Sequence, residues 1–419
     1  MIQRQRALLV GVNINNQTSF KESMEELGNL AAACELEIAG VIEQNLKVVN
    51  ASYHIGSGKV EEVRLLIDEA QADIVVFNNE LSPSQLRNLE DALQREIIDR
   101  TMLILEIFAK RAKTREAKLQ VDLARLKYML PRLVGLNDDL GRQGGGSGLK
   151  NKGSGETKLE LDKRRIESKI AELSKELELI VNERNTQRSK RNKAGLPSVA
   201  LVGYTNAGKS TLMNALVEVY QKNAAKKVFE KDMLFATLET SVRNITLPDK
   251  KAFLLADTVG FISKLPHELI KAFRSTLEEV KTADLLLHVV DSSNHNFLQQ
   301  IEVTNETLKQ IGADTIPTIL VFNKADLTDV TVPCIKAGRV YISAKMNSGI
   351  EELVQLIGKK IFTQYMECKM LIPYNQGNAV AYFNDHANVK AVSYERDGTL
   401  LTVECRESDY KRFEEFAIT

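Results

Sequence analysis

The chain has 419 residues with 56 basic and 56 acidic side chains, and the resulting zero net charge excludes attraction of the whole protein to a polyanion. No basic and apolar leader opens the sequence, and no apolar run reaches the roughly 18 residues of a membrane span, so we expect a cytoplasmic protein. The four cysteines, far apart and without metal-ligand spacing, predict reduced thiols in the core.

Residues 1–105 alternate short apolar runs with helical stretches, which predicts an N-terminal parallel α/β domain. Gly56-Ser57-Gly58-Lys59 resembles a phosphate loop, but its spacing is incomplete, so a glycine turn before a helix is the favoured interpretation. Strands are expected at 7–12, 38–42, 74–77 and 101–105, and helices near 19–33, 59–70 and 82–93.

Residues 106–195 predict a long antiparallel helical hairpin, with arms at 106–130 and 157–193 and Pro131 and a glycine-rich loop between them. The loop, residues 141–155, contains seven glycines, the basic residues Arg142, Lys150 and Lys152, and no acid. A solvated helix face would explain the charge alone. A basic and flexible tip is better explained as a contact to an RNA phosphate backbone.

The sequence Gly203 to Ser210 has the form G-x-x-x-x-G-K-S and lies between an apolar run and a helical stretch. This context is typical of a phosphate-binding loop, in which backbone N–H groups and a helix N-terminus surround an anion. Lys209 would reach the β- and γ-phosphates, and the Ser210 hydroxyl would bind Mg²⁺. We therefore expect a GTP-binding domain at 196–363, which the following motifs support.

Three further motifs follow in order, each at the end of an expected strand. Asp257-Thr258-Val259-Gly260 supplies a carboxylate that can hold Mg²⁺ through water and an N–H for the γ-phosphate, and Thr237 would complete the metal shell. Asn323-Lys324-Ala325-Asp326 predicts guanine, because a carboxylate at Asp326 accepts from N1–H and the 2-amino group together. Ser343-Ala344-Lys345 follows the last of these strands.

Phe261 stands where many GTPases carry the glutamine that orients the attacking water. Intrinsic hydrolysis is therefore expected to be slow, on the order of 10⁻⁴ to 10⁻² s⁻¹, until a partner completes the site. Asn206 has two interpretations. Its resemblance to the asparagine of several GTPases with an apolar residue after D-x-x-G implies that it helps to bind K⁺, and the alternative is that it only bonds its own backbone. The tail, residues 364–419, predicts a small α+β domain with strands at 379–382, 389–395 and 400–405 and a helix at 408–416.

Taken together, these features resemble the HflX family of translation-associated GTPases. The motifs that carry the resemblance are Gly56 to Glu62, Gln120-Val121-Asp122-Leu123-Ala124, Gly144-Gly145-Gly146, Gly155-Glu156-Thr157, Gly203 to Ser210, Phe235-Ala236-Thr237-Leu238 and Asp257 to Ile262.

The resemblance implies a GTPase that binds the large (50S) ribosomal subunit, including 23S rRNA, and helps to split stalled or idle 70S ribosomes under stress. It also implies ATP binding at the N-terminal domain, and we expect a monomer that associates peripherally with ribosomes or membrane. The alternative class is a nucleotide-switched module that binds a protein or a regulatory RNA without ribosome contact.

The expected site residues fall into four groups. The catalytic group is Lys209, Asn206 and Gly260. Mg²⁺ is expected at Ser210, Thr237 and, through water, Asp257, and RNA at Arg142, Lys150 and Lys152. Nucleotide contacts are expected from Gly203, Tyr204, Thr205, Asn206, Ala207, Gly208, Lys209, Ser210, Thr211, Phe235, Ala236, Thr237, Asp257, Thr258, Val259, Gly260, Asn323, Lys324, Asp326, Ser343, Ala344 and Lys345.

Overall fold

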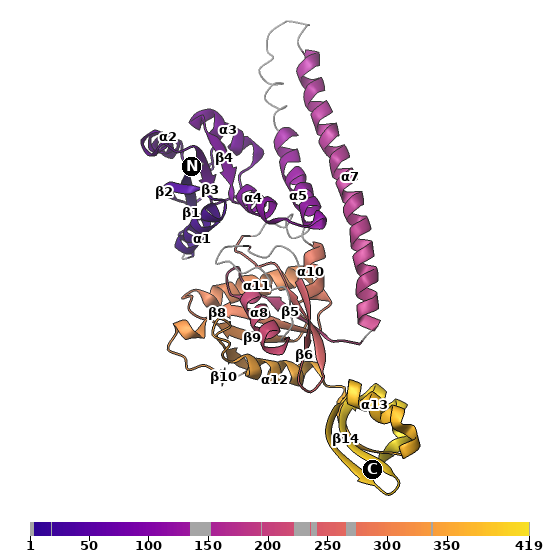
Figure 1. Ribbon diagram of the computed structural model, residues 1–419. Coiled ribbons are helices and arrows are strands. Elements are labelled where there is room, and N and C mark those ends of the chain that lie inside the picture. Colours follow the sequence, from indigo (N-terminus) through magenta and orange to yellow (C-terminus); the bar gives the residue numbers. More distant parts are fainter. Residues whose placement is uncertain are drawn as a thin grey trace. The chain divides into compact units, whose positions relative to one another are not determined.

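The computed structural model describes residues 4–17, 19–134, 152–193, 195–221, 235, 241–264, 274–336 and 338–418 (Figure 1). The chain forms two compact units. The first comprises Met1–Gln187, Lys231–Glu239 and Ile262–Thr276, and the second comprises Arg188–Glu230, Thr240–Phe261 and Leu277–Thr419.

The N-terminal part of the first unit is a parallel sheet, as the sequence predicts, and its strand order is β2-β1-β3-β4. Alternate residues of β1, Leu8, Val10 and Val12, share a core with apolar side chains of α2 and α3. Helices α1 and α4 contact each other. The elements are β1 (Arg6–Ile14), α1 (Phe20–Ala33), β2 (Glu37–Leu46), α2 (Ser57–Ala70), β3 (Ile74–Phe77), α3 (Pro83–Leu93), β4 (Glu96–Asp99) and α4 (Arg100–Arg111).

The prediction of a strand at 101–105 is wrong, because these residues lie in α4 and the fourth strand precedes them. Asp99 is the N-cap of α4 and accepts from the Met102 N–H at 2.9 Å. An apolar run of this length fits a buried strand and a buried helix equally well. The cap residue decides between them here, because its carboxylate satisfies a free N–H of the first helical turn.

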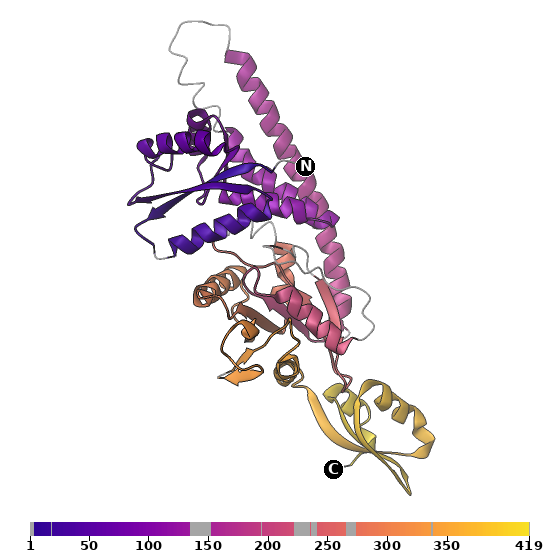
Figure 2. The same cartoon turned by 60° about the vertical axis from the view of Figure 1, so that its left-hand side comes forward.

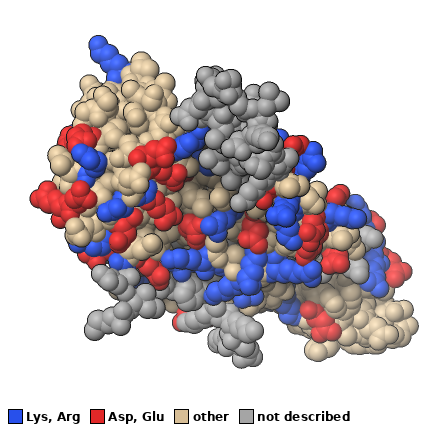
Figure 3. All heavy atoms as spheres, turned by 90° about the horizontal axis from the view of Figure 1, so that it is seen from above, with Lys and Arg blue, Asp and Glu red and all other residues tan. Residues whose placement is uncertain are grey.

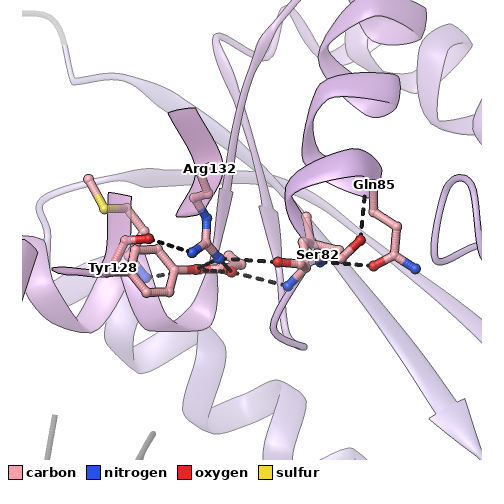
Figure 4. A network of polar contacts seen from close by, with 7 residues as sticks. Ser82, Gln85, Tyr128 and Arg132 are labelled. Atoms are coloured by element: carbon pink, nitrogen blue, oxygen red, sulfur yellow. Dashed lines mark hydrogen bonds and ion pairs between the residues drawn. The ribbon is translucent and has the colours of Figure 1, made fainter. Parts of the chain in front are cut away.

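A buried polar network that includes Tyr128 and Arg132 attaches the end of helix α5 (Arg115–Val134) to the sheet (Figure 4). Asp99 accepts from the Leu81 N–H and from Arg132 Nη2, both at 3.1 Å, and from the Tyr128 hydroxyl. The Arg132 guanidinium lies 3.3 Å from the centre of the Tyr128 ring. Burial and the Asp99 charge raise the pKa of Tyr128, so this hydroxyl stays a donor to the carboxylate.

The expected hairpin consists of α5 and α7 (Lys152–Lys193), which lie side by side in Figures 1 and 2. Three differences from the prediction concern the arms: residues 106–111 belong to α4 and α5 begins only at Arg115, α5 continues through Pro131, and α7 begins inside the expected loop. Arg115 pairs with Glu176 at 2.6 Å and Arg184 with Glu116 at 3.0 Å. The apolar contact between the arms is formed by Leu119, Leu123, Leu126, Ile170, Leu173, Leu177 and Ile180.

The second unit contains a sheet of order β10-β11-β9-β8-β5-β7-β6. The pairs between β11 and β7 are parallel, and the edge strands β10 and β6 are antiparallel to their neighbours. The elements are β5 (Ser198–Val202), α8 (Lys209–Tyr220), β6 (Ser241–Thr246), β7 (Ala252–Asp257), α10 (Arg274–Lys281), β8 (Leu285–Asp291), α11 (Phe297–Ile311), β9 (Thr318–Asn323), β10 (Cys334–Lys336), β11 (Arg339–Tyr341) and α12 (Ile350–Ile361).

The C-terminal part of this unit is a small α+β domain, with an antiparallel sheet of order β13-β14-β12-β15. The prediction of a strand at 379–382 is wrong. These residues lie in a helix whose Ala379 and Phe383, four residues apart, face the core. The elements are β12 (Tyr365–Ile372), α13 (Gly377–His386), β13 (Asn388–Glu395), β14 (Gly398–Arg406), α14 (Glu407–Arg412) and β15 (Ala417–Ile418).

The charges and helices of the described chain fit the composition. The face drawn in Figure 3 carries both basic and acidic side chains. Within the described ranges, no helix is both long enough and apolar enough to cross a membrane.

Candidate nucleotide-binding site

The predicted motifs of the second unit lie at the carboxyl edge of its sheet. The loop Gly203 to Ser210 follows β5, Asp257 ends β7, Asn323 ends β9 and Ser343 follows β11. Open parallel sheets bind ligands at this edge, because the loops that leave the strands converge there.

Two glycines of the loop have no room for a side chain. Gly208 has a φ of 88°, and a Cβ there would lie 2.2 Å from Asn323 Nδ2. Gly203 has a φ of 143°, and a Cβ there would lie 2.2 Å from the Val289 carbonyl oxygen. Both positions therefore require glycine for their backbone conformation and for their close neighbours.

Lys209 is the first residue of α8, and its side chain is buried beneath the loop. Its ammonium donates to the carbonyl oxygens of Gly203 at 3.0 Å and Tyr204 at 2.7 Å. Burial lowers the pKa of Lys209 to about 8, and the nearby Asp257 charge opposes this shift. Burial thus disfavours the charged form of Lys209, and a bound anion would stabilise that form.

Ser210 and Asp257 meet behind the loop, where the Ser210 hydroxyl donates to Asp257 Oδ2 at 2.7 Å. The buried Thr258 hydroxyl donates to the Leu201 carbonyl oxygen at 2.6 Å and ties the D-x-x-G segment to β5. GTPases generally use Mg²⁺. The adjoining hydroxyl and carboxylate oxygens fit that ion, because Mg²⁺ prefers hard oxygen ligands.

The segment after Asp257 pairs with the loop as a short parallel bridge between Tyr204 and Phe261. The Thr205 N–H donates to the Phe261 carbonyl oxygen at 2.8 Å, and the Phe261 N–H donates to the Gly203 carbonyl oxygen at 3.1 Å. A Cβ at Gly260 would lie 2.7 Å from Thr205 Cγ2, so the backbone here lies directly against the loop. The Phe261 ring is buried and carries no group for proton transfer.

Asn323 connects three of the motifs. Its Nδ2 donates to the Ala207 carbonyl oxygen, and its Oδ1 accepts from the Ala344 N–H, both at 3.0 Å. Asp326 and Lys345 are exposed. The side chain that would read the base therefore faces solvent, while Asn323 holds the surrounding loops together.

Several expected residues lie outside the described part of the chain: Ala236 and Thr237 near the metal, and Arg142 and Lys150 in the loop of the hairpin. Lys152 begins α7. Phe235 belongs to the first unit, where its ring packs edge-to-face on Phe108 with centroids 4.6 Å apart. The structure thus places Phe235 among the apolar side chains of the first unit.

Sequence reasoning missed a polar cluster of the first unit at Ser263, two residues after Phe261. Arg100 Nη2 donates to the Ser263 carbonyl oxygen at 3.1 Å and to its hydroxyl at 3.2 Å. Glu26 accepts from both Arg100 and Ser263, and Arg100 also donates to Asn78 Oδ1 at 3.0 Å. No short motif marks these partners, because Arg100 and Ser263 are 163 residues apart.

Three family models match the chain in succession. Residues 21–109 match a model described as GTP-binding GTPase N-terminal, and residues 111–191 match one described as GTP-binding GTPase Middle Region. Residues 198–324 match the model described as 50S ribosome-binding GTPase. With the loop, the D-x-x-G segment and the Asn323 contacts at one sheet edge, these matches define a P-loop GTPase, an enzyme that binds and hydrolyses GTP.

Relatives extend this class to the whole chain. GTPase HflX of Caldanaerobacter subterraneus is 42% identical over 99% of this chain and 94% of its own length. GTPase HflX of Escherichia coli is 38% identical over 97% of this chain and 95% of its own. A GTP-binding protein from Sulfolobus solfataricus, solved with GDP, is 25% identical over 86% of this chain and 99% of its own, with a TM-score of 0.43. The chain belongs to the HflX family of GTPases.

Proposed function

We propose that this GTPase binds the large ribosomal subunit and promotes the dissociation of stalled or idle 70S ribosomes, with GTP hydrolysis stimulated by the ribosome. The observation that carries the proposal is the match of residues 198–324 to a family described as 50S ribosome-binding GTPases. The hairpin supports it, because α5 and α7 form a long arm that leads to a basic loop without acids.

We propose the following roles in the nucleotide site. The loop N–H groups and Lys209 bind the phosphates, and Asp326 reads guanine. Ser210, Thr237 and, through water, Asp257 would hold Mg²⁺. When bound, Mg²⁺ would neutralise charge on the β- and γ-phosphates. The Gly260 N–H would meet the γ-phosphate once the Phe261 bridge to the loop opens. Support comes from the Ser210–Asp257 contact and from the position of Asn323 between the loops.

For hydrolysis, we propose that Asn206 helps to bind a K⁺ ion that supplies charge near the transferred phosphate. Asn206 lies in the loop with a φ of 62°, a left-handed conformation that asparagine tolerates. Hydrolysis is expected to be at least about tenfold faster with 50S subunits than alone. It should also be faster in K⁺ than in Na⁺. Equal rates in the two salts would exclude the ion but leave the phosphate site intact.

The sedimentation experiment separates the ribosome from other partners. The GTP-loaded chain is sedimented with 70S and 50S particles at two salt concentrations, beside a variant with Arg142, Lys150 and Lys152 replaced by alanine. For each phosphate contact, the logarithm of the affinity should fall by roughly 0.7–0.9 when the salt concentration rises tenfold. The triple variant should therefore bind more weakly, with a flatter salt dependence and unchanged GTP affinity.

The matched control replaces Lys309, Lys336 and Lys360, three exposed lysines of the G domain, with alanine and so removes the same charge. Equal loss in both triple variants would show a general charge effect and no specific loop contact. Failure of the parent protein to sediment with any particle would favour the alternative class, a switch that binds another protein or RNA. Titration with labelled ATP tests the proposed second nucleotide at the N-terminal domain.

A further inference from the structure

The segment Asp291-Ser292-Ser293 begins at the last residue of β8 and has no part in the motifs described above. Asp291 Oδ2 lies 2.7 Å from the ammonium nitrogen of Lys324, the second residue of the Asn323-Lys324-Ala325-Asp326 motif. The side chains of Asp291 and Lys324 are only 15% and 27% exposed. A partly buried ion pair with this geometry fixes the direction in which the lysine side chain runs.

The carboxylate is itself held from the other side. Asp291 Oδ1 accepts from the Ser293 N–H at 3.0 Å and from the Ser293 hydroxyl at 2.6 Å. Both oxygens of Asp291 are therefore engaged, and the side chain has little freedom to rotate away from Lys324. Ser293 thus orients the carboxylate toward the lysine.

Ser292, which lies between Asp291 and Ser293, supports the backbone of Asn323. The Ser292 N–H and hydroxyl both donate to the Asn323 carbonyl oxygen, at 2.9 and 2.7 Å. The same Asn323 holds Ala207 and Ala344 through its side chain. The segment 291–293 therefore supports both Asn323 and Lys324, from a strand that sequence motifs do not assign to the site.

Lys324 has an unusual backbone conformation, which its surroundings must stabilise. Its φ of 60° lies in the left-handed region, which costs a non-glycine residue about 1–3 kcal/mol and persists only where the surroundings enforce it. A free lysine also loses up to about 2 kcal/mol of rotamer freedom when a ligand covers it. Holding the ammonium in advance removes that loss and leaves the apolar methylene chain in a fixed place.

We propose that Asp291 is a positioning residue for the guanine base: through its ion pair it holds the Lys324 methylene chain flat as one wall of the base site. The proposal rests on the base site proposed above and adds a residue that acts on it. The ligand class is a guanine nucleotide, and GTP and GDP are affected equally because they share the base. Asp291 touches neither the phosphates nor the reacting atoms.

The test measures dissociation constants and dissociation rates of ribose-labelled fluorescent GTP and GDP with the full chain. Asp291→Asn should weaken both nucleotides by roughly 10- to 30-fold, the equivalent of the rotamer freedom that Lys324 regains. The change should appear mainly as faster dissociation, with turnover at saturating GTP within about twofold of the parent. Asp291→Glu keeps the charge and should recover part of the affinity.

Glu404→Gln is the matched control, because it breaks a lysine–carboxylate pair of the same 2.7 Å length, between Lys251 of the G domain and Glu404 of the C-terminal domain. It should leave nucleotide affinity unchanged. A double-mutant cycle with Lys324→Met then separates positioning from general destabilisation. Asp291→Asn should cost little affinity once the ammonium is gone, whereas a structural defect would cost the same in both backgrounds.

Two outcomes overturn different parts of the argument. If the parent protein binds guanine and xanthine nucleotides alike, the base site itself is misassigned. If the parent prefers guanine while both Asp291 variants bind like Glu404→Gln, only the positioning role fails. If Asp291→Asn does not fold, the nucleotide affinities of Asp291→Glu and Lys324→Met decide. The glutamate carboxylate is one methylene longer and displaces the lysine, so Asp291→Glu should also change the affinity; an unchanged affinity would overturn the positioning role.

Discussion

The ammonium of Lys209 is buried at the base of the phosphate loop, and its surroundings tune its proton affinity. Burial lowers its pKa to about 8 in the free protein, with the Asp257 charge in opposition. A bound triphosphate would add several negative charges and raise the pKa again. Above pH 8, GTP binding should therefore take up close to one proton, and affinity should fall by up to tenfold per pH unit.

Calorimetry of GTP binding in buffers of different ionisation enthalpy measures this proton directly. At pH 9 the uptake should approach one proton, and at pH 7 it should be near zero because Lys209 is already charged in the free protein. The measurement at pH 7 is the internal control. An absence of uptake at pH 9 would show that the lysine keeps its proton in the free protein.

Motif residues and their supports differ in how far the sequence predicts them. The spacing of Gly203 to Ser210 indicates a strand-loop-helix turn, and the structure contains one. Glycine is required at Gly203 and Gly208, because their neighbours leave no space for a side chain. Asp291 gives no such signal, since an aspartate at a strand end is common. Its partner is 33 residues away and reaches it only because β8 and β9 are adjacent.

The attachment of α5 to the N-terminal sheet depends on one carboxylate. Asp99 is 2% exposed and receives donors from the β3–α3 connection, from the start of α4 and from α5. Asp99→Asn leaves the Arg132 cation without its counter-charge, which should lower the local opening free energy of α5 by roughly 3–5 kcal/mol. Tyr128→Phe removes one donor of several and should cost about 1.5–3 kcal/mol.

Hydrogen exchange of the α5 amides in the full chain measures these local changes without assuming two-state unfolding. Arg115→Ala is the control on the same helix. The Arg115 side chain is 79% exposed, so loss of its ion pair with Glu176 should cost less than about 1 kcal/mol. Equal protection in Asp99→Asn and Arg115→Ala would show that α5 is held by apolar contacts alone.

Elements with clear periodicity or caps could be predicted from the sequence, and short apolar runs could not. Ser82 and Gln85 form a capping box, with reciprocal contacts of 3.0 and 3.2 Å, at the start of a helix that the sequence indicates. Residues 101–105 and 379–382 lack such a signal within the run and belong to helices. Hydrophobicity alone does not decide such runs, because both conformations bury the same side chains; the Asp99 cap decides the first run and packing of Ala379 and Phe383 in the core decides the second.

Within the second unit, the turn between β6 and β7 binds the C-terminal domain. Lys251 lies 2.7 Å from Glu404 and above the rings of Phe362 and Tyr365, at 5.7 and 5.2 Å from their centres. Burial opposes the Lys251 charge, but Glu404 and Asp249 outweigh it and raise its pKa. Burial would raise the pKa of Glu404, but hydrogen bonds from Lys251 and Asn388 lower it below its ordinary value of 4.5.

Lys251→Met should weaken this docking by about 1.5–3 kcal/mol, the cost of a charge-assisted hydrogen bond. Small-angle X-ray scattering of the full chain should then show a larger radius of gyration than the parent. Because the folded pKa of Glu404 is depressed, the contribution of the pair is present above pH 4.5 and is lost as the pH falls through the folded pKa.

The control for this prediction is Lys390→Met, which breaks an exposed pair with Glu367 inside the C-terminal domain. Its scattering should match that of the parent. Identical curves for Lys251→Met and Lys390→Met would mean that the domain is held by Phe362, Tyr365 and their neighbours alone.

The bridge between Tyr204 and Phe261 makes the nucleotide loop accessible to optical spectroscopy. The chain contains no tryptophan, so Tyr204→Trp would introduce the only indole, which can be excited at wavelengths that tyrosine does not absorb. Its neighbour across the bridge is the residue that directly follows Gly260. Separation of the D-x-x-G segment from the loop would expose the indole to water and shift its emission to longer wavelength, so each opening of the loop could be timed in a stopped-flow fluorimeter.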